Sequence, residues 1–360
     1  MDALIAVYPK NVFYYSGSPV ARSQLLLDYL PEDPGRRTLA AAVVPGNGGN
    51  ILVCPAEHEA INRDEAWVEQ IQTFDARWES PMEGIARAIN HMGLSRGRLG
   101  IEATYLTVAY RDELQHLLPA AELVPSDTLF EWIRALKIPS EIELLKQAAD
   151  ILDDAMLDAL SSAKIGDTEW ELHSRILEGA ERRGAEHCRG ILHAGDNAEA
   201  AFSGAGLYKL APGDIIRTDY AAFLHGYPSN LSRVAVVGEP TTLQQKIYAN
   251  LISGHRRIWE FMRPGVTGRE VFEFSIKAYA DLGYFTAYRT ILGHSLGLGY
   301  HERPMLTAAE TMPLRVSMVF ALEPKNLVPY HIQDQVVVGE YDTYLQSDKF
   351  DTRELFVVGA

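Results

Sequence analysis

The pattern of strand-like and helical stretches changes near residue 130 and divides this sequence into two parts with different predicted folds. Residues 3–125 alternate strand-like runs such as ALIAVY and NILVCP with helical stretches such as PMEGIARAINHMGL. From about residue 130, long helical stretches such as EIELLKQAADILDDAMLDALSSA frame strand-rich segments. We therefore expect an α/β domain at residues 1–130 and an α+β domain with an antiparallel sheet at residues 131–360. Near this boundary, Pro139 and then Ser140 ahead of Glu143 predict a helix start.

Composition and charge exclude several classes of protein. The 360 residues are 47% apolar, which supplies a core for both halves, and the net charge of -15 argues against nucleic-acid or anionic-membrane partners. The sequence has no apolar run of 18 or more residues and no signal-peptide pattern at its start. Cys54 and Cys188 form neither a disulfide framework nor a metal motif. A soluble, cytoplasmic protein is expected.

The stretch TDYAAFLHGYPSNLSR, residues 218–233, indicates two short strands around a turn at His225 and Gly226. This hairpin would direct Asp219 and Asn230 toward one point. An aspartate and an asparagine at a shared point raise the question of whether the pair binds a metal ion.

Three later stretches also set polar groups among apolar residues. ILGHSLGLGYHERP carries His294 and His301, VFALEPKNLVP carries Glu323, and HIQDQVVV carries Gln333 and Asp334. A carboxylate is rarely buried without a partner. We therefore expect a partner for Glu323, and a histidine is the natural candidate.

The order of these motifs resembles the C-terminal domain of the creatinase, prolidase and aminopeptidase P superfamily, peptidase family M24. The stretch KIPSEIELLKQAADI also resembles the start of that domain in prolidase and aminopeptidase P. The resemblance covers nearly the whole chain, including a smaller N-terminal α/β domain. It implies an α/β N-terminal domain followed by the α+β pita-bread fold, two α-β halves that enclose a pocket, usually in a homodimer.

The resemblance also implies a ligand set, and this chain departs from it. The peptidase members hold two divalent ions at positions that correspond to Asp219, Asn230, His294, Glu323 and Gln333. The two amides, Asn230 and Gln333, stand where bridging carboxylates are found. An amide offers one neutral carbonyl oxygen, and each lost charge pair is worth about 4 kcal/mol at an effective dielectric near 20. We therefore expect no dinuclear site, although Asp219, His294 and Glu323 form a possible mononuclear set.

Other positions in the pocket also differ from the peptidase pattern. Phe202 replaces a histidine, and His331 replaces an arginine that prolidase-like enzymes often carry, whereas His301 matches the family's second histidine. Together with Asn230 and Gln333, Phe202 and His331 are predicted to contact the substrate.

The leading expectation is a hydrolase that needs no metal or other cofactor and cleaves a C–N bond in a small amidine, guanidine or amide. Creatinase and ectoine hydrolase are metal-independent members of the superfamily. Catalysis of this kind needs a base for water and an acid for the leaving nitrogen. These roles are assigned among His294, His301, Glu323 and Asp219, because histidines titrate near neutral pH and buried carboxylates change their pKa.

Three alternatives stay open. The first is an Xaa-Pro metallopeptidase of the aminopeptidase P or prolidase type, with one or two manganese, cobalt or zinc ions, or a version inactivated by mutation at Asn230 and Gln333. The second is a non-catalytic descendant that binds a ligand in the same pocket. The third is a lyase that uses the same acid and base groups.

Overall fold

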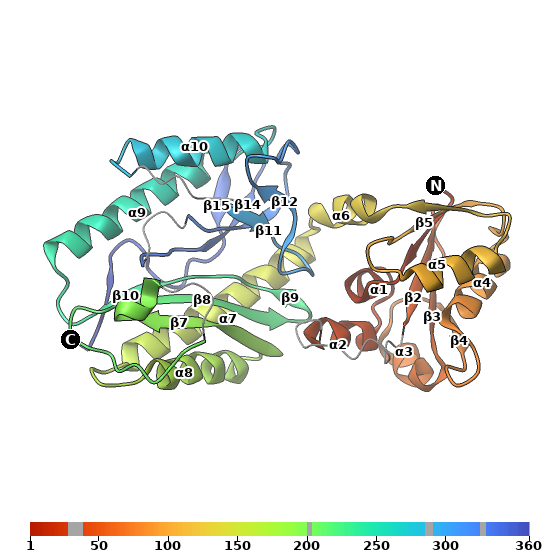
Figure 1. The fold of residues 1–360 in the computed structure, drawn as a ribbon, viewed down its shortest axis with the longest axis horizontal. Helices are drawn as coiled ribbons and strands as arrows, with labels where there is room; N and C mark the ends of the chain where they lie inside the picture. The colour runs from red at the N-terminus through yellow and green to blue at the C-terminus, as the bar shows by residue number, and fades with distance from the viewer. Residues whose placement is uncertain (28–38, 200–203, 285–290, 325–328, 360) are drawn as a thin grey trace. The chain divides into compact units, whose positions relative to one another are not determined.

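The computed structural model describes residues 1–27, 39–199, 204–284, 291–324 and 329–359. The chain divides into two compact units, Met1–Ile133 and Arg134–Ala360 (Figure 1). Among the described residues, no helix is long and apolar enough to cross a membrane.

The first unit is built on one six-stranded sheet with the order β4-β3-β2-β1-β5-β6. The central strand β1 pairs antiparallel with β2 and parallel with β5. All four residues of β1 are buried, which explains its unbroken apolar sequence. The elements are β1 (Ala3–Ala6), α1 (Pro9–Ser16), α2 (Pro19–Leu27), β2 (Ala41–Pro45), β3 (Ile51–Pro55), a short 3-10 helix (Ala56–His58), α3 (Glu59–Glu65), β4 (Gln70–Phe74), α4 (Pro81–His91), β5 (Arg98–Ile101), α5 (Val108–Leu117), β6 (Glu122–Pro125) and α6 (Asp127–Ala135), the last of which runs across the division between the units.

Helix α4 shows how the sequence defines these elements. Pro81 occupies the first turn, and the backbone N–H of Ser80 donates to Glu83 Oε2 at 2.8 Å, so a capping box begins the helix. Its apolar side chains Ile85 and Ile89 are buried in the core of this unit. Apart from β2 and β3, which pair antiparallel without a helix between them, the described strands alternate with helices as the sequence predicts, and this half is an α/β structure.

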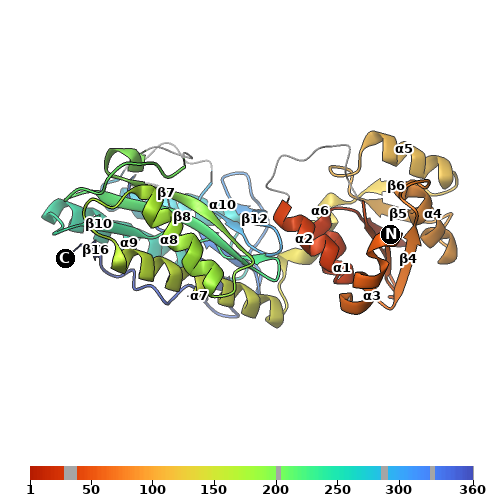
Figure 2. The same cartoon turned by 90° about the horizontal axis from the view of Figure 1, so that it is seen from below.

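In its described residues, the second unit contains two sheets and four long helices. The first sheet has the order β16-β10-β8-β7, with β9 paired to β8, and the second has the order β12-β11-β13-β14-β15 with all its pairs antiparallel. In Figures 1 and 2, α7 and α8 lie along the first sheet, while α9 and α10 lie beside the second. The elements are α7 (Pro139–Ser162), α8 (Glu169–Arg182), β7 (His187–Ala194), a 3-10 helix (Gly195–Glu199), β8 (Ile215–Leu224), β9 (Tyr227–Pro228), β10 (Val234–Val237), α9 (Thr242–Phe261), α10 (Gly268–Ala280), β11 (Gly293–Ser295), β12 (Glu302–Leu306), β13 (Val319–Leu322), β14 (Asp334–Val338), β15 (Thr343–Leu345) and β16 (Phe356–Val358).

Helix α7 begins where the sequence predicts, but by other contacts. Pro139 is its first residue, and Glu141, not Glu143, accepts the backbone N–H of Ile138 at 2.8 Å. The expected box between Ser140 and Glu143 does not form, because the helix begins one residue before Ser140 and places Glu141 at the third position. Glu143 instead accepts a hydrogen bond from Gln147, one turn further along.

Strand β8 determines which side chains can enter the site. Its residues Ile216 and Tyr220 belong to the core cluster formed with α7 and α8, whereas Ile215 belongs to the cluster formed with α9 and α10. Successive side chains of a strand point to opposite faces. Arg217 and Asp219 therefore share the face of β8 that is directed away from α7 and α8.

Candidate functional site

The hairpin after β8 brings Asp219 and Asn230 together. Its turn has two residues with positive φ, His225 at 50° and Gly226 at 83°, as a two-residue hairpin turn requires. The Asn230 side-chain amide donates to Asp219 Oδ1 at 3.1 Å and to the Tyr220 carbonyl at 3.2 Å. The prediction that these two side chains meet is confirmed.

A bridge between the two sheets adds Gln333 to this pair. Ser232 and Gln333 exchange backbone hydrogen bonds of 3.1 and 3.2 Å, so the chain entering β14 lies beside the hairpin. Gln333 Nε2 donates to Asn230 Oδ1 at 2.6 Å, and the Ser232 hydroxyl donates to Gln333 Oε1 at 3.2 Å. The amides thus form a directed chain that ends on the Asp219 carboxylate.

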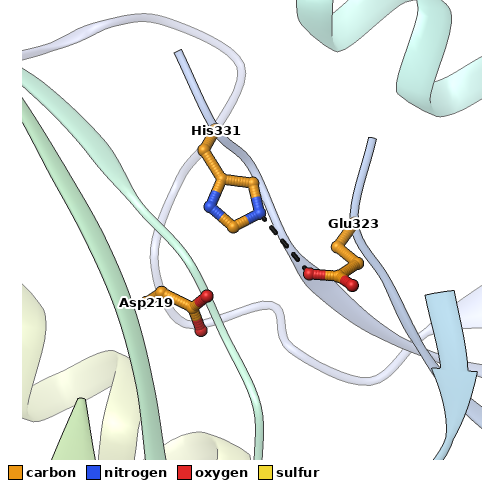
Figure 3. Close-up of side chains that lie close together, drawn as sticks. All are labelled: Asp219, Glu323 and His331. Atoms are coloured by element: carbon orange, nitrogen blue, oxygen red, sulfur yellow. Dashed lines mark ion pairs between the residues drawn. The ribbon is translucent and has the colours of Figure 1, made fainter. Parts of the chain in front are cut away.

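A second group of side chains gathers on the other side of Asp219. Asp219, Glu323 and His331 each offer one ligand atom, and these atoms all lie within 4.8 Å of one another. Figure 3 shows the three side chains directed toward a common point, Asp219 from β8, Glu323 just after β13 and His331 just before β14. Glu323 and His331 are buried, and Glu323 Oε2 lies 3.7 Å from His331 Nε2. The expected histidine partner of Glu323 is therefore His331.

Arg217 is a charged neighbour that the sequence analysis missed. It is buried on the same face of β8 as Asp219, two residues away. Burial lowers the pKa of its guanidinium, while the charges of Asp219 and Glu323 oppose that shift. The spacing of two residues in a predicted strand was the signal that could have identified it.

His294 and His301 form a separate aromatic group. Their ring centroids are 4.1 Å apart in an edge-to-face arrangement, and Tyr300 lies 4.6 Å from His301. His294 is buried on β11, whereas His301 is exposed. Arg189 of β7 lies over the Tyr300 ring at 4.6 Å, which ties this loop to the first sheet.

Two further predicted site residues are Phe202 and His331. Phe202 lies outside the described residues. His331 was expected to contact substrate, and the structure places it in the carboxylate group instead of His294, which is absent from that group among the described residues. The individual roles assigned to His294, His301, Glu323 and Asp219 stay predictions.

The side chains present fit one divalent ion. Two carboxylates and an imidazole are a ligand set that zinc and other first-row ions accept. The amides of Asn230 and Gln333 are hydrogen-bonded to each other and to Asp219. Neither side chain supplies a carboxylate that could hold a second ion. The fit is therefore to a mononuclear site.

Comparison with known proteins identifies the family of this chain. Residues 143–345 match the family described as metallopeptidase family M24, and residues 1–136 match the creatinase/prolidase N-terminal domain. The chain belongs to metallopeptidase family M24. The match to the M24 description covers more than half of the chain, so the superfamily expected from the motifs is confirmed.

Individual M24 relatives match along nearly the full length. An Xaa-Pro dipeptidase of Pyrococcus horikoshii is 25% identical over 349 residues, covering 94% of this chain and 90% of the relative. An Xaa-Pro dipeptidase of Pyrococcus furiosus is 24% identical over 351 residues, covering 94% and 91% of the two chains. The crystal structure of the X-Pro aminopeptidase from Thermotoga maritima superposes with a TM-score of 0.84 at 20% identity, covering 99% of this chain and 98% of that one. The expected pita-bread architecture is confirmed.

These findings correct two expectations. A metal-independent hydrolase of a small amidine, guanidine or amide is wrong, and so is the expected absence of a cofactor. The family is one of metallopeptidases, the relatives are Xaa-Pro dipeptidases, and Asp219, Glu323 and His331 form a possible metal site. The two amides argued only against a dinuclear site, and the possible mononuclear site was given too little weight. As a member of a peptidase family, the chain is a hydrolase that acts on C–N bonds, as predicted.

Proposed function

We propose that this protein is an Xaa-Pro dipeptidase that works with one divalent ion held by Asp219, Glu323 and His331. The observation that carries the proposal is the convergence of these three ligand atoms within 4.8 Å. The near full-length similarity to two Xaa-Pro dipeptidases supports the substrate class. Manganese, cobalt and zinc are the ions to test first.

The bound ion would polarise a peptide carbonyl and make water acidic enough to act near neutral pH. The chain's own groups perform the other tasks. Glu323 offers one carboxylate oxygen to the ligand group, and because the side chain is buried at the point where the ligands meet, its second oxygen can accept a proton there. His301 is exposed beside the buried His294, and its imidazole can supply a proton to the leaving nitrogen. The chain of amides holds Asp219 in one orientation.

Dipeptide hydrolysis by matched variants tests the proposal. Protein dialysed against manganese is assayed with Xaa-Pro dipeptides and with the same dipeptides lacking proline. Glu323→Gln should reduce kcat/KM by more than the roughly 10–100-fold loss that is typical when a residue hydrogen-bonded to a metal ligand is replaced. The control Glu340→Gln, at an exposed position, should have no effect. No hydrolysis of Xaa-Pro dipeptides by the manganese-loaded protein would refute the proposed function.

A variant of His301 separates proton transfer from metal binding. His301→Gln should lower kcat by roughly 10²-fold or more if the imidazole acts as the general acid. Its bound manganese should remain, because His301 is outside the ligand group. Loss of metal in this variant, or an unchanged kcat, would remove His301 from the assigned role.

We also propose that the protein acts as a homodimer in the cytoplasm. The two cysteines support a reducing compartment, since both are free and buried, and burial raises the pKa of the Cys54 thiol to about 11 and of Cys188 to about 12. Light scattering coupled to size exclusion tests the dimer, and a mass of 40.0 kDa in solution would contradict it.

A further inference from the structure

Arg217 has no part in the mechanism above, yet it is a cation inside the site. Only 5% of its surface is exposed, and it lies on the same face of β8 as Asp219. An arginine stays ionised in proteins even when buried, and its charge must be compensated nearby. The charges of Asp219 and Glu323 act on its guanidinium.

The register of the sheet places Arg217 firmly. Its Cα pairs with that of His193 on β7 and with that of Val234 on β10, so β8 is held on both sides at this position. Asp219 pairs with Ile191 of β7 two residues further along the same ladder. A residue spacing of two in a strand corresponds to about 7 Å. The backbone of Arg217 is therefore fixed in the sheet two residues from the ligand Asp219, with its side chain on the same face.

The two amides, Asn230 and Gln333, add no negative charge around this cation. The carboxylates of Asp219 and Glu323 belong to the ligand group, and their charges act on one permanent cation, Arg217. One divalent ion can be accommodated by these ligands with His331. A second divalent ion would meet the Arg217 charge and the two amides that are already hydrogen-bonded to each other.

We propose that Arg217 serves as the resident second cation of this site, restricting it to one divalent ion and lowering the affinity for that ion. The inference rests on the proposed metal site of Asp219, Glu323 and His331. Arg217 is thus a positioning residue that acts through the charges of the ligands.

Manganese titration by calorimetry tests the effect of this charge on affinity. Arg217→Met should bind manganese at least about tenfold more tightly than the unaltered protein, because a like charge near the ion is removed. Arg217→Lys keeps the charge and should stay within about threefold. Arg256→Met, on an exposed face of α9, is the matched control and should not change the affinity. Equal or weaker binding by a folded Arg217→Met would overturn the inference.

Stoichiometry provides a second test that does not depend on Arg217→Met folding alone. Asn230→Asp combined with Gln333→Glu supplies two further carboxylates, and with Arg217 in place this protein should still bind one manganese ion per chain. Adding Arg217→Met to the pair should raise the number to two. Two ions bound while Arg217 is present would overturn the inference.

The outcomes separate this inference from the proposed function. Manganese bound by the unaltered protein and lost in Glu323→Gln, with no tightening in Arg217→Met, would refute only the role of Arg217. Manganese bound only after Arg217 is replaced would support the role of Arg217 and contradict the proposed function. No binding by any of these proteins would overturn both.

Discussion

At the scale of single residues, Asn230 and Gln333 show why amides suit this pocket. A carboxylate at either position would face another acceptor, since Gln333 donates to Asn230 and Asn230 donates to Asp219. Amides carry both a donor and an acceptor, so they can be linked in series where carboxylates would repel one another. The hydrogen bonds that link Gln333, Asn230 and Asp219 therefore form without a second ion.

Restoring one carboxylate should destabilise the metal-free protein. Asn230→Asp places a second acceptor where Asn230 Nδ2 now lies 3.1 Å from Asp219 Oδ1. In metal-free protein the variant should lower the free energy of unfolding by about 1–3 kcal/mol, because a buried hydrogen bond becomes a repulsion. Manganese should recover part of this loss by binding the folded state.

Thermal unfolding with and without manganese measures the change. Asn47→Asp, in the exposed turn after β2, is the control and should leave the melting temperature unchanged in both conditions. An Asn230→Asp variant as stable as the unaltered protein in the absence of metal would show that the amide chain is dispensable.

At the scale of elements, sequence reasoning succeeded where the relevant contacts are local. The hairpin that joins Asp219 to Asn230 was predictable, because its turn at His225 and Gly226 and the spacing of its strands lie in one short stretch. The pairing of Glu323 with His331 was not predictable in the same way. It depends on how the ends of β13 and β14 are brought together, which no local pattern specifies. Arg217, two residues before Asp219 in β8, was overlooked.

The connection between the two sheets is also stabilised by a network of buried charged side chains. Arg233, just before β10, donates from Nε to Asp153 of α7 at 2.9 Å, and its Nη1 lies 3.0 Å from Asp334 of β14. His255 of α9 lies 3.0 Å from the other oxygen of Asp334. All of these side chains are buried. The network therefore connects elements of both sheets next to Gln333.

Replacing Arg233 should consequently destabilise the second unit strongly. Arg233→Met leaves two buried carboxylates without their cation, and breaking such a network typically costs about 3–5 kcal/mol. Urea unfolding followed by circular dichroism measures this loss. Arg256→Met, which removes an exposed pair with Glu260, should stay within about 0.5 kcal/mol. A comparable small effect for Arg233→Met would mean that packing alone holds the sheets together.

At the scale of the whole molecule, the period of the apolar pattern changes near residue 130, where the sequence predicts a boundary between two domains. The structure divides at Ile133 and Arg134, close to the boundary expected at residue 130. The motifs also predicted the family. Metal dependence was misjudged, since the possible metal site includes a histidine, His331, that meets the carboxylates only in the folded chain.

The most direct test of the account is the number of manganese ions per chain. Protein of this sequence is purified without chelator, saturated with manganese, freed of unbound metal and analysed by inductively coupled plasma mass spectrometry. The account predicts about one ion per chain, lost in Glu323→Gln, because the pocket offers one ligand set of two carboxylates and one imidazole. No retained ion, or two ions per chain, would contradict it.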